Sequence, residues 1–286
     1  MLLEQRHPCQ QTPVEDDGAG PVVDDGEDHD DALWEAVTEL LTTLPKVLGA
    51  SWRPHFDRLL PALQPYLREA HPSSDHSLAI GIIAESLNQL EQNGSTYFEQ
   101  VVPHALRFSA SSDCTCRQNS VFCLGVLGLF GERCTVLRYM QSMLEALQPR
   151  LSEEEEEVVC DNGIGAIARL VLAYGCDLPL SSIVPAILAR LPLKADKGEN
   201  APAIRCLMQV AHDERTRGMM ECHGNALLSV LACMLGSDYA EGPVQLEIRA
   251  FLQWLHAQAP EQLTAMAMAL AEPSQRTRLL ECLTPR

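Results

Sequence analysis

A short apolar pattern recurs along this 286-residue chain at nearly constant intervals. Each copy has two apolar residues, a proline or a substitute for it, and further apolar residues. The copies centre on Pro61, Pro103, Leu144, Pro185 and Ser229, which are 42, 41, 41 and 44 residues apart. Second apolar stretches with helical spacing lie between the copies, and turn signals separate the stretches. The pattern therefore predicts paired helices that repeat along the chain.

A helical repeat of about 40–47 residues is typical of HEAT and armadillo proteins. We therefore expect an all-α fold, a right-handed α-solenoid of about six HEAT helix pairs. The predicted pairs lie near residues 31–70, 74–108, 113–151, 153–192, 197–236 and 243–271, with a short last helix near 273–283. In such a solenoid each pair contacts mainly its neighbours, and one helix of each pair lines a concave face.

The composition narrows the class of partner. The chain has 39 acidic and 21 basic side chains and a net charge of −18, and aromatic residues make up only 5%. Because phosphate binding requires positive surface, we expect no DNA and no membrane partner, and a basic partner is favoured instead. The acidic charge is concentrated near the N-terminus, so we predict that residues 1–30 form a disordered acidic linker or loop and that 31–286 form the repeat domain.

The 11 cysteines lie mostly within apolar stretches, which favours reduced thiols in the cytosol or nucleus over a disulfide framework. We find no run of 18 apolar residues and no signal peptide, and so predict no transmembrane helix.

The sequence offers little support for an enzyme. Gly163–Ala168 fits G-x-G-x-x-A, but a dinucleotide site needs a strand before the first glycine, whereas a helix start precedes it here. Small residues for close helix packing are the better interpretation. Cys114 and Cys116 form C-x-C without a second pair at zinc spacing. We therefore expect no catalytic residue, no metal and no cofactor. The acidic run Glu153–Glu157 suits a helix N-terminus, or the rim of a site for a basic peptide.

Superposing the repeats places a polar position in register near successive helix starts. This column comprises Asp75, Asn119, Asn162 and Glu199, with Asp161 and Asn200 beside it. Helix capping, for which Asp and Asn are favoured, is one interpretation. The other is a ladder of carboxylate and amide oxygens that accepts hydrogen bonds from a basic cargo peptide. The two roles are compatible, and all six residues are candidate cargo-binding residues.

Three stretches carry a resemblance to a known family. They are CDNGIGAIAR at 160–169, IVPAILARLPL at 183–193 and DKGEN at 196–200. Together they resemble the C-terminal HEAT repeats of the importin-β (karyopherin) family of nuclear import receptors. The resemblance covers about residues 31–286, whereas residues 1–12 show none.

The resemblance implies several properties. A similar receptor shuttles between cytoplasm and nucleus and carries basic cargo with a nuclear localisation signal. Its cargo includes histones H3 and H4 with a histone chaperone, and some ribosomal proteins. In similar receptors a lysine pocket receives the histone H3 tail, and the matching positions here are Asp75, Asn162 and Glu199. Ran-GTP binds N-terminal repeats that this chain lacks, so we expect a C-terminal part or short form that does not respond fully to Ran. A monomer is the default for such a solenoid.

One alternative function stays open, a HEAT scaffold for folded partners without import function. Binding that persists at high salt would favour this scaffold, because basic-tail binding should weaken as salt rises.

Overall fold

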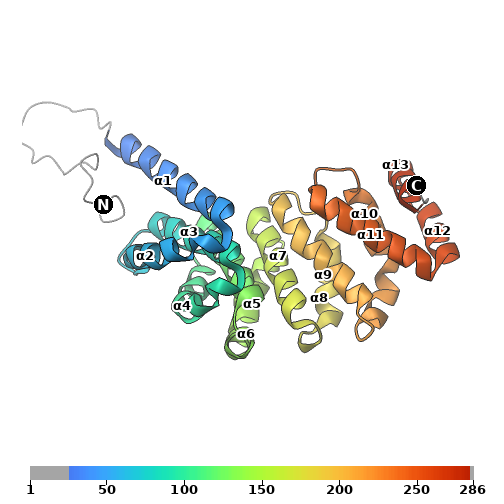
Figure 1. Cartoon of the computed structure of the whole chain (residues 1–286), viewed down its shortest axis with the longest axis horizontal. Coiled ribbons are helices and arrows are strands. Elements are labelled where there is room, and N and C mark those ends of the chain that lie inside the picture. The colour runs from blue at the N-terminus through green and yellow to red at the C-terminus, as the bar shows by residue number, and fades with distance from the viewer. Residues whose placement is uncertain (1–25, 284–286) are drawn as a thin grey trace, which may run out of the picture. The chain divides into compact units, whose positions relative to one another are not determined.

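The computed structural model describes the backbone of residues 26–283 (Figure 1). Its side chains are described from residue 36 to residue 283. The chain divides into two compact units. Unit 1 takes the residues up to Cys123 together with 130–132, and unit 2 takes 124–129 together with the residues from Arg133 onward. The division falls within one helix, α5 (Cys114–Phe130). All regular elements of residues 26–283 are helical, so the expected all-α fold is confirmed.

The helices form the pairs expected from the repeat period. Unit 1 and the shared helix contain α1 (Gly26–Leu48), α2 (Arg53–Leu63), α3 (Ser73–Leu90), α4 (Phe98–Phe108) and α5. Unit 2 continues with α6 (Arg133–Leu147), α7 (Glu157–Tyr174), α8 (Leu180–Arg190), α9 (Asn200–His212), α10 (Gly224–Met234), α11 (Gly242–Gln258), α12 (Pro260–Met268) and α13 (Pro273–Leu283). Short 3-10 segments join many of these helices, and proline stands inside α2, α4 and α8.

The N-terminal boundary differs from the prediction. Helix α1 begins at Gly26, so residues 26–30 are helical although we placed them in a disordered linker. The sequence of α1 opens with Gly-Glu-Asp-His-Asp-Asp, and acidic residues are favourable at a helix N-terminus. Residues 1–25 of the predicted linker lie outside the described part of the chain.

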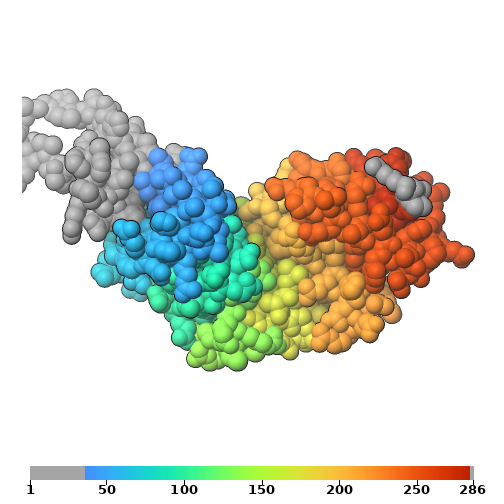
Figure 2. All heavy atoms as spheres, viewed as in Figure 1, coloured from blue at the N-terminus to red at the C-terminus, as the bar shows by residue number. Residues whose placement is uncertain are grey.

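First helices of successive pairs pack against one another within each unit. Helix α1 contacts α3 in unit 1, and α7 contacts α9 in unit 2. Drawn as spheres, the atoms of neighbouring helices touch along the visible face of each unit (Figure 2). Small residues permit the closest approach, since a Cβ on Gly125 would lie 2.6 Å from the Cα of Ala166 in α7. This stacking of helix pairs buries a continuous core within each unit.

Helix α7 is apolar enough to satisfy the length and hydropathy criteria for a membrane span. The candidate segment is Glu157–Asp177, with a mean hydropathy of 1.3, and it is the one such segment in the part of the chain that the structure describes. Because 78% of this window is buried inside the protein, its apolar side chains pack into the core of unit 2.

Arginines connect the ends of successive repeats. Three guanidinium groups each donate to a backbone carbonyl that lies about one repeat earlier in the chain. We call them the inter-repeat arginines: Arg107 donates to Leu67 O, Arg190 to Leu151 O at 3.1 Å, and Arg278 to Leu235 O at 3.0 Å. The chain has only three lysines among its 21 basic side chains. The preference for arginine over lysine suits the bonding of one repeat to the next, because a planar guanidinium presents five donors in fixed directions.

Candidate functional site

Four of the six predicted cargo-binding residues are buried in unit 2 and bonded within the chain. Asp161, Asn162, Glu199 and Asn200 are between 0% and 5% exposed. They lie on α7 and at the start of α9, around the loop that joins α8 to α9. They form a polar network inside the stacked helices.

Asp161 holds the α8–α9 loop against α7. Its Oδ2 accepts hydrogen bonds from three successive backbone N–H groups, those of Lys194 at 3.1 Å, Ala195 at 2.9 Å and Asp196 at 3.0 Å. Burial raises the pKa of the Asp161 carboxyl, and the backbone hydrogen bonds oppose that rise. One carboxylate oxygen thus accepts hydrogen bonds from three successive N–H groups in the irregular part of the loop, just before the 3-10 turn Lys197–Glu199.

Two asparagines complete the loop's hydrogen bonds. The Asn162 amide donates to Val158 O at 2.9 Å and to Asp196 Oδ2 at 3.0 Å. Asn200 accepts from the Leu193 N–H at 2.8 Å and donates back to Leu193 O at 2.9 Å. Both asparagine side chains therefore form hydrogen bonds with groups of the same chain.

Glu199 forms a buried ion pair with Arg169 of α7. Both guanidinium Nη atoms bond to the carboxylate, with Nη2 2.9 Å from Oε1. The pair lies directly over Gly165, where an added Cβ would fall 1.5 Å from Glu199 Oε2. The glycines of Gly163–Ala168 therefore serve close packing, as we predicted in preference to a nucleotide site.

These contacts correct the predicted column. The four residues do not form an exposed row of acceptors, and they do not cap their α-helices, since neither α7 nor α9 has a side-chain cap. The reason is the helix start. Helix α7 begins at Glu157, so Asp161 and Asn162 lie in its second turn and face the neighbouring loop.

The remaining two predicted residues lie in unit 1 and are half-buried. Asp75 is in the first turn of α3, where its carboxylate lies 2.8 Å from His71 Nδ1. Asn119 is in the second turn of α5 and donates to Ser77 O at 3.0 Å. It packs over Gly81, where an added Cβ would come within 2.7 Å of the Asn119 amide nitrogen. The structure does not bring Asp75 into the cavity that Asn119 lines.

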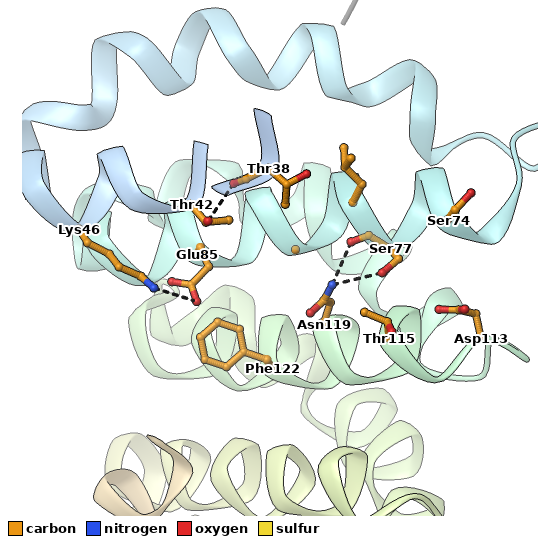
Figure 3. Close-up of a pocket in the computed structure, with 12 residues that line it drawn as sticks. Thr38, Thr42, Lys46, Ser74, Ser77, Glu85, Asp113, Thr115, Asn119 and Phe122 are labelled. Atoms are coloured by element: carbon orange, nitrogen blue, oxygen red, sulfur yellow. Dashed lines mark hydrogen bonds and ion pairs between the residues drawn. The ribbon is translucent and has the colours of Figure 1, made fainter. Parts of the chain in front are cut away.

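The cavity beside Asn119 is a groove between three first helices, with a volume of about 520 Å³ (Figure 3). We call it the polar groove. Its walls come from α1 (Thr38, Thr42, Lys46), α3 (Ser74, Ser77, Leu78, Gly81, Glu85), α5 (Thr115, Asn119, Phe122) and Asp113 just before α5. Most of these side chains carry a hydroxyl, an amide or a charge, so the groove can hydrogen-bond to a polar ligand.

Two carboxylates from different segments of the chain line the polar groove. Asp113 precedes α5 and accepts a hydrogen bond from the Cys116 N–H at 2.6 Å, as a helix-capping residue does. Glu85 on α3 lies 3.9 Å from Lys46 Nζ on α1. In Figure 3 the Asn119 amide and the Ser77 hydroxyl lie between Glu85 and Asp113.

Sequence reasoning missed most of the polar groove, although one signal was present. Thr38, Thr42 and Lys46 are four residues apart, and Thr115 stands four residues before Asn119. This spacing places polar side chains along one face of each helix. Two other cavities, of about 270 and 380 Å³ in unit 2, are lined mainly by apolar side chains. The polar groove differs from both in its chemistry.

Comparison with known proteins identifies relatives of the chain. Probable importin subunit beta-4 of Schizosaccharomyces pombe is 24% identical over 241 residues, which are 82% of this chain and 22% of that protein. Importin-4 of Homo sapiens is 29% identical over 199 residues, 69% of this chain and 18% of that protein. These importins are homologues of the chain. Importin-4 of Mus musculus is also 29% identical, over 60% of this chain and 16% of its own length.

The chain thus spans about a fifth of the length of the relatives it matches. No protein-family model matches it. Among solved structures, a designed armadillo repeat protein aligns over 99% of this chain and 98% of its own, with 13% identity and a TM-score of 0.46.

Proposed function

We propose that the chain is the cargo-binding part of a nuclear import receptor and that its cargo is a basic segment. The observation that carries this proposal is its homology to importin-4 over as much as 69% of its length. The cargo that fits best is the tail of histone H3, or histones H3 and H4 held by a histone chaperone, and basic ribosomal proteins fit the same chemistry.

The charge of the chain supports a basic cargo. A net charge of −18 attracts cationic segments at long range and raises the rate at which they associate. At short range, carboxylate and amide oxygens accept hydrogen bonds from lysine ammonium groups and from an extended backbone. The polar groove of unit 1 offers such acceptors in Glu85, Asp113 and Asn119.

The proposal assigns different roles to the six predicted residues. Asn119 lines the polar groove and is the candidate for direct contact, with half-buried Asp75 as a second candidate. The buried network of Asp161, Asn162, Glu199 and Asn200 holds unit 2 together, and its contribution to cargo binding is indirect. In a full receptor, Ran-GTP would act through repeats outside this chain. We propose that the chain works as a monomer, shuttling between cytoplasm and nucleus.

The test is the binding of a fluorescent histone H3 N-terminal peptide, followed by anisotropy at low and high salt. A matched peptide in which glutamine replaces every lysine and arginine serves as the control. We expect the basic peptide to bind, the neutral peptide to bind at least tenfold more weakly, and salt to weaken only the basic peptide. Equal binding of both peptides, or binding that does not depend on salt, would refute the proposal.

A HEAT scaffold without import function is the second candidate. The observation that favours it is the apolar cavity of unit 2 between α10, α11 and α12, which is lined by Phe251, Trp254 and several leucines. An apolar cavity of this kind suits a folded partner that inserts a large side chain. In that case partner binding would persist at high salt and would be lost on Trp254→Ala, while Asn119→Ala would leave it unchanged.

A further inference from the structure

One end of the polar groove already holds the chemical group that a basic cargo would bring. Lys46, in the last turn of α1, directs its ammonium at Glu85 of α3, with 3.9 Å between Nζ and Oε1 (Figure 3). Both residues line the groove, as do Thr42 and Phe122. The chain itself therefore shows an ammonium group seated at this carboxylate.

The surroundings of Glu85 suit a lysine side chain. The Thr42 hydroxyl lies on the same helix face as Lys46, one turn earlier, and Figure 3 places the Phe122 ring beside Glu85. An aromatic ring supports the methylene stem of a lysine and attracts its charge. The pair is accessible from solvent, because the side chains of Lys46 and Glu85 are 56% and 28% exposed.

We propose that the Glu85 end of the polar groove is a subsite for a lysine side chain of the bound segment, and that Lys46 fills this subsite in the free chain. The inference rests on the proposed function, because it takes a basic segment as the ligand. Lys46 is then an internal competitor, and an incoming lysine must displace it from Glu85.

The competitor is weakly held. Exposed ion pairs contribute little, and at 3.9 Å the Lys46 ammonium is at the outer limit of a salt bridge. The need to displace Lys46 from Glu85 therefore reduces the affinity for an incoming lysine only moderately. Removing Lys46 should tighten the binding of a lysine-rich segment by about two- to fivefold.

The experiment compares Lys46→Gln with Lys194→Gln, which removes the same charge from an exposed lysine of unit 2. The probes are fluorescent octalysine and the histone H3 peptide, titrated at low salt with anisotropy as the readout. We expect Lys46→Gln to tighten the binding of both probes about two- to fivefold and Lys194→Gln to change it by less than about 1.5-fold. Equal tightening in the two variants would mean that only the overall charge matters and would overturn the inference.

A double-mutant cycle with Glu85→Gln tests the subsite directly. We expect Glu85→Gln to weaken both probes and to abolish the gain from Lys46→Gln. If Lys46→Gln tightens binding equally in the Glu85→Gln background, the Glu85 subsite is refuted. Lys46 also lies where a cation complements the α1 dipole, so thermal unfolding of each variant is followed in parallel. A change in stability with no change in affinity would assign Lys46 that helix-end role and overturn the inference.

The outcomes separate this inference from the proposed function. Salt-dependent peptide binding without the Lys46 effect refutes only the inference. The Lys46 effect with octalysine, but no binding of the histone peptide, keeps the lysine subsite and rejects the histone cargo. If neither probe binds wild type or Lys46→Gln, both proposals are refuted.

Discussion

Gly165→Ala tests the buried network of unit 2 at its tightest point. The new Cβ would lie 1.5 Å from Glu199 Oε2, 2.5 Å from Glu199 Cδ and 3.1 Å from Arg169 Nη1. Since no Cβ is tolerated at such distances, the carboxylate must move away from the guanidinium. Breaking a buried ion pair costs about 3–5 kcal/mol. For a unit of this size we expect the melting temperature to fall by about 6–20 °C.

The assay is urea and thermal unfolding followed by far-UV circular dichroism, with two matched glycine variants. Gly242→Ala has nothing within 4 Å of its new Cβ and should change stability by less than about 0.5 kcal/mol. Gly128→Ala meets a Leu170 methyl at 2.2 Å, a side-chain tip that can move, and should cost about 1–3 kcal/mol. A Gly165→Ala protein as stable as Gly242→Ala would refute the reasoning. Full additivity of the stability losses caused by Gly165→Ala and Glu199→Ala would also refute it, because both changes remove the same interaction.

Three further outcomes can be checked separately. Burial raises the pKa of the Cys206 thiol to about 12, so an aromatic disulfide reagent should label exposed Cys222 in the native protein and Cys206 only after unfolding. The Arg215 side chain lowers the pKa of Asp213 to about 2 by donating a hydrogen bond to its carboxylate. Because the pKa of Asp213 is lower in the folded state, its carboxylate stabilises the fold at pH values above the unfolded pKa of about 3.9. This stabilisation is lost as the pH falls towards 2. Carboxyl NMR titration should show the Asp213 pKa rising towards its ordinary value in Arg215→Gln, and an unchanged pKa would contradict the assignment. Arg190→Lys replaces the guanidinium that donates to Leu151 O and should lower the unfolding free energy by about 0.5–1.5 kcal/mol in urea titrations. An unchanged unfolding free energy would contradict the role of the guanidinium.

The fold was predictable because its signals are local and repeated. A period near 42 residues, apolar residues at helical spacing and turn residues between them gave helix pairs close to those observed. The prediction of close packing at Gly163–Ala168 was also correct, since a Cβ added at Gly163 or Gly165 would lie within 3 Å of a neighbouring side chain.

The candidate site was not predictable to the same degree, because it depends on helix phase and on long-range contacts. We placed a helix pair from residue 153, but α7 begins at Glu157. The predicted column required Asp161 and Asn162 to lie in the first turn of their helix, whereas both lie in the second turn of α7 and bond to the α8–α9 loop. The partner of Glu199 is Arg169, 30 residues earlier, and no local pattern marks such a pair. The polar groove requires three helices from successive repeats, so only the tertiary structure reveals it.

The use of arginine in place of lysine, seen in the inter-repeat arginines, limits the covalent chemistry that can act on this chain. Basic side chains of this chain are mostly guanidinium groups, as in the inter-repeat arginines, and the sequence carries only three side-chain amines, those of Lys46, Lys194 and Lys197. Enzymes that attach acetyl or ubiquitin groups to lysine therefore have three acceptors here. Amine-directed crosslinkers would report mainly the lysines of a bound basic cargo, whereas reagents that activate carboxylates have 39 acidic side chains to choose from. A crosslinking map of any complex should therefore start from the carboxylates of this chain and the amines of its partner.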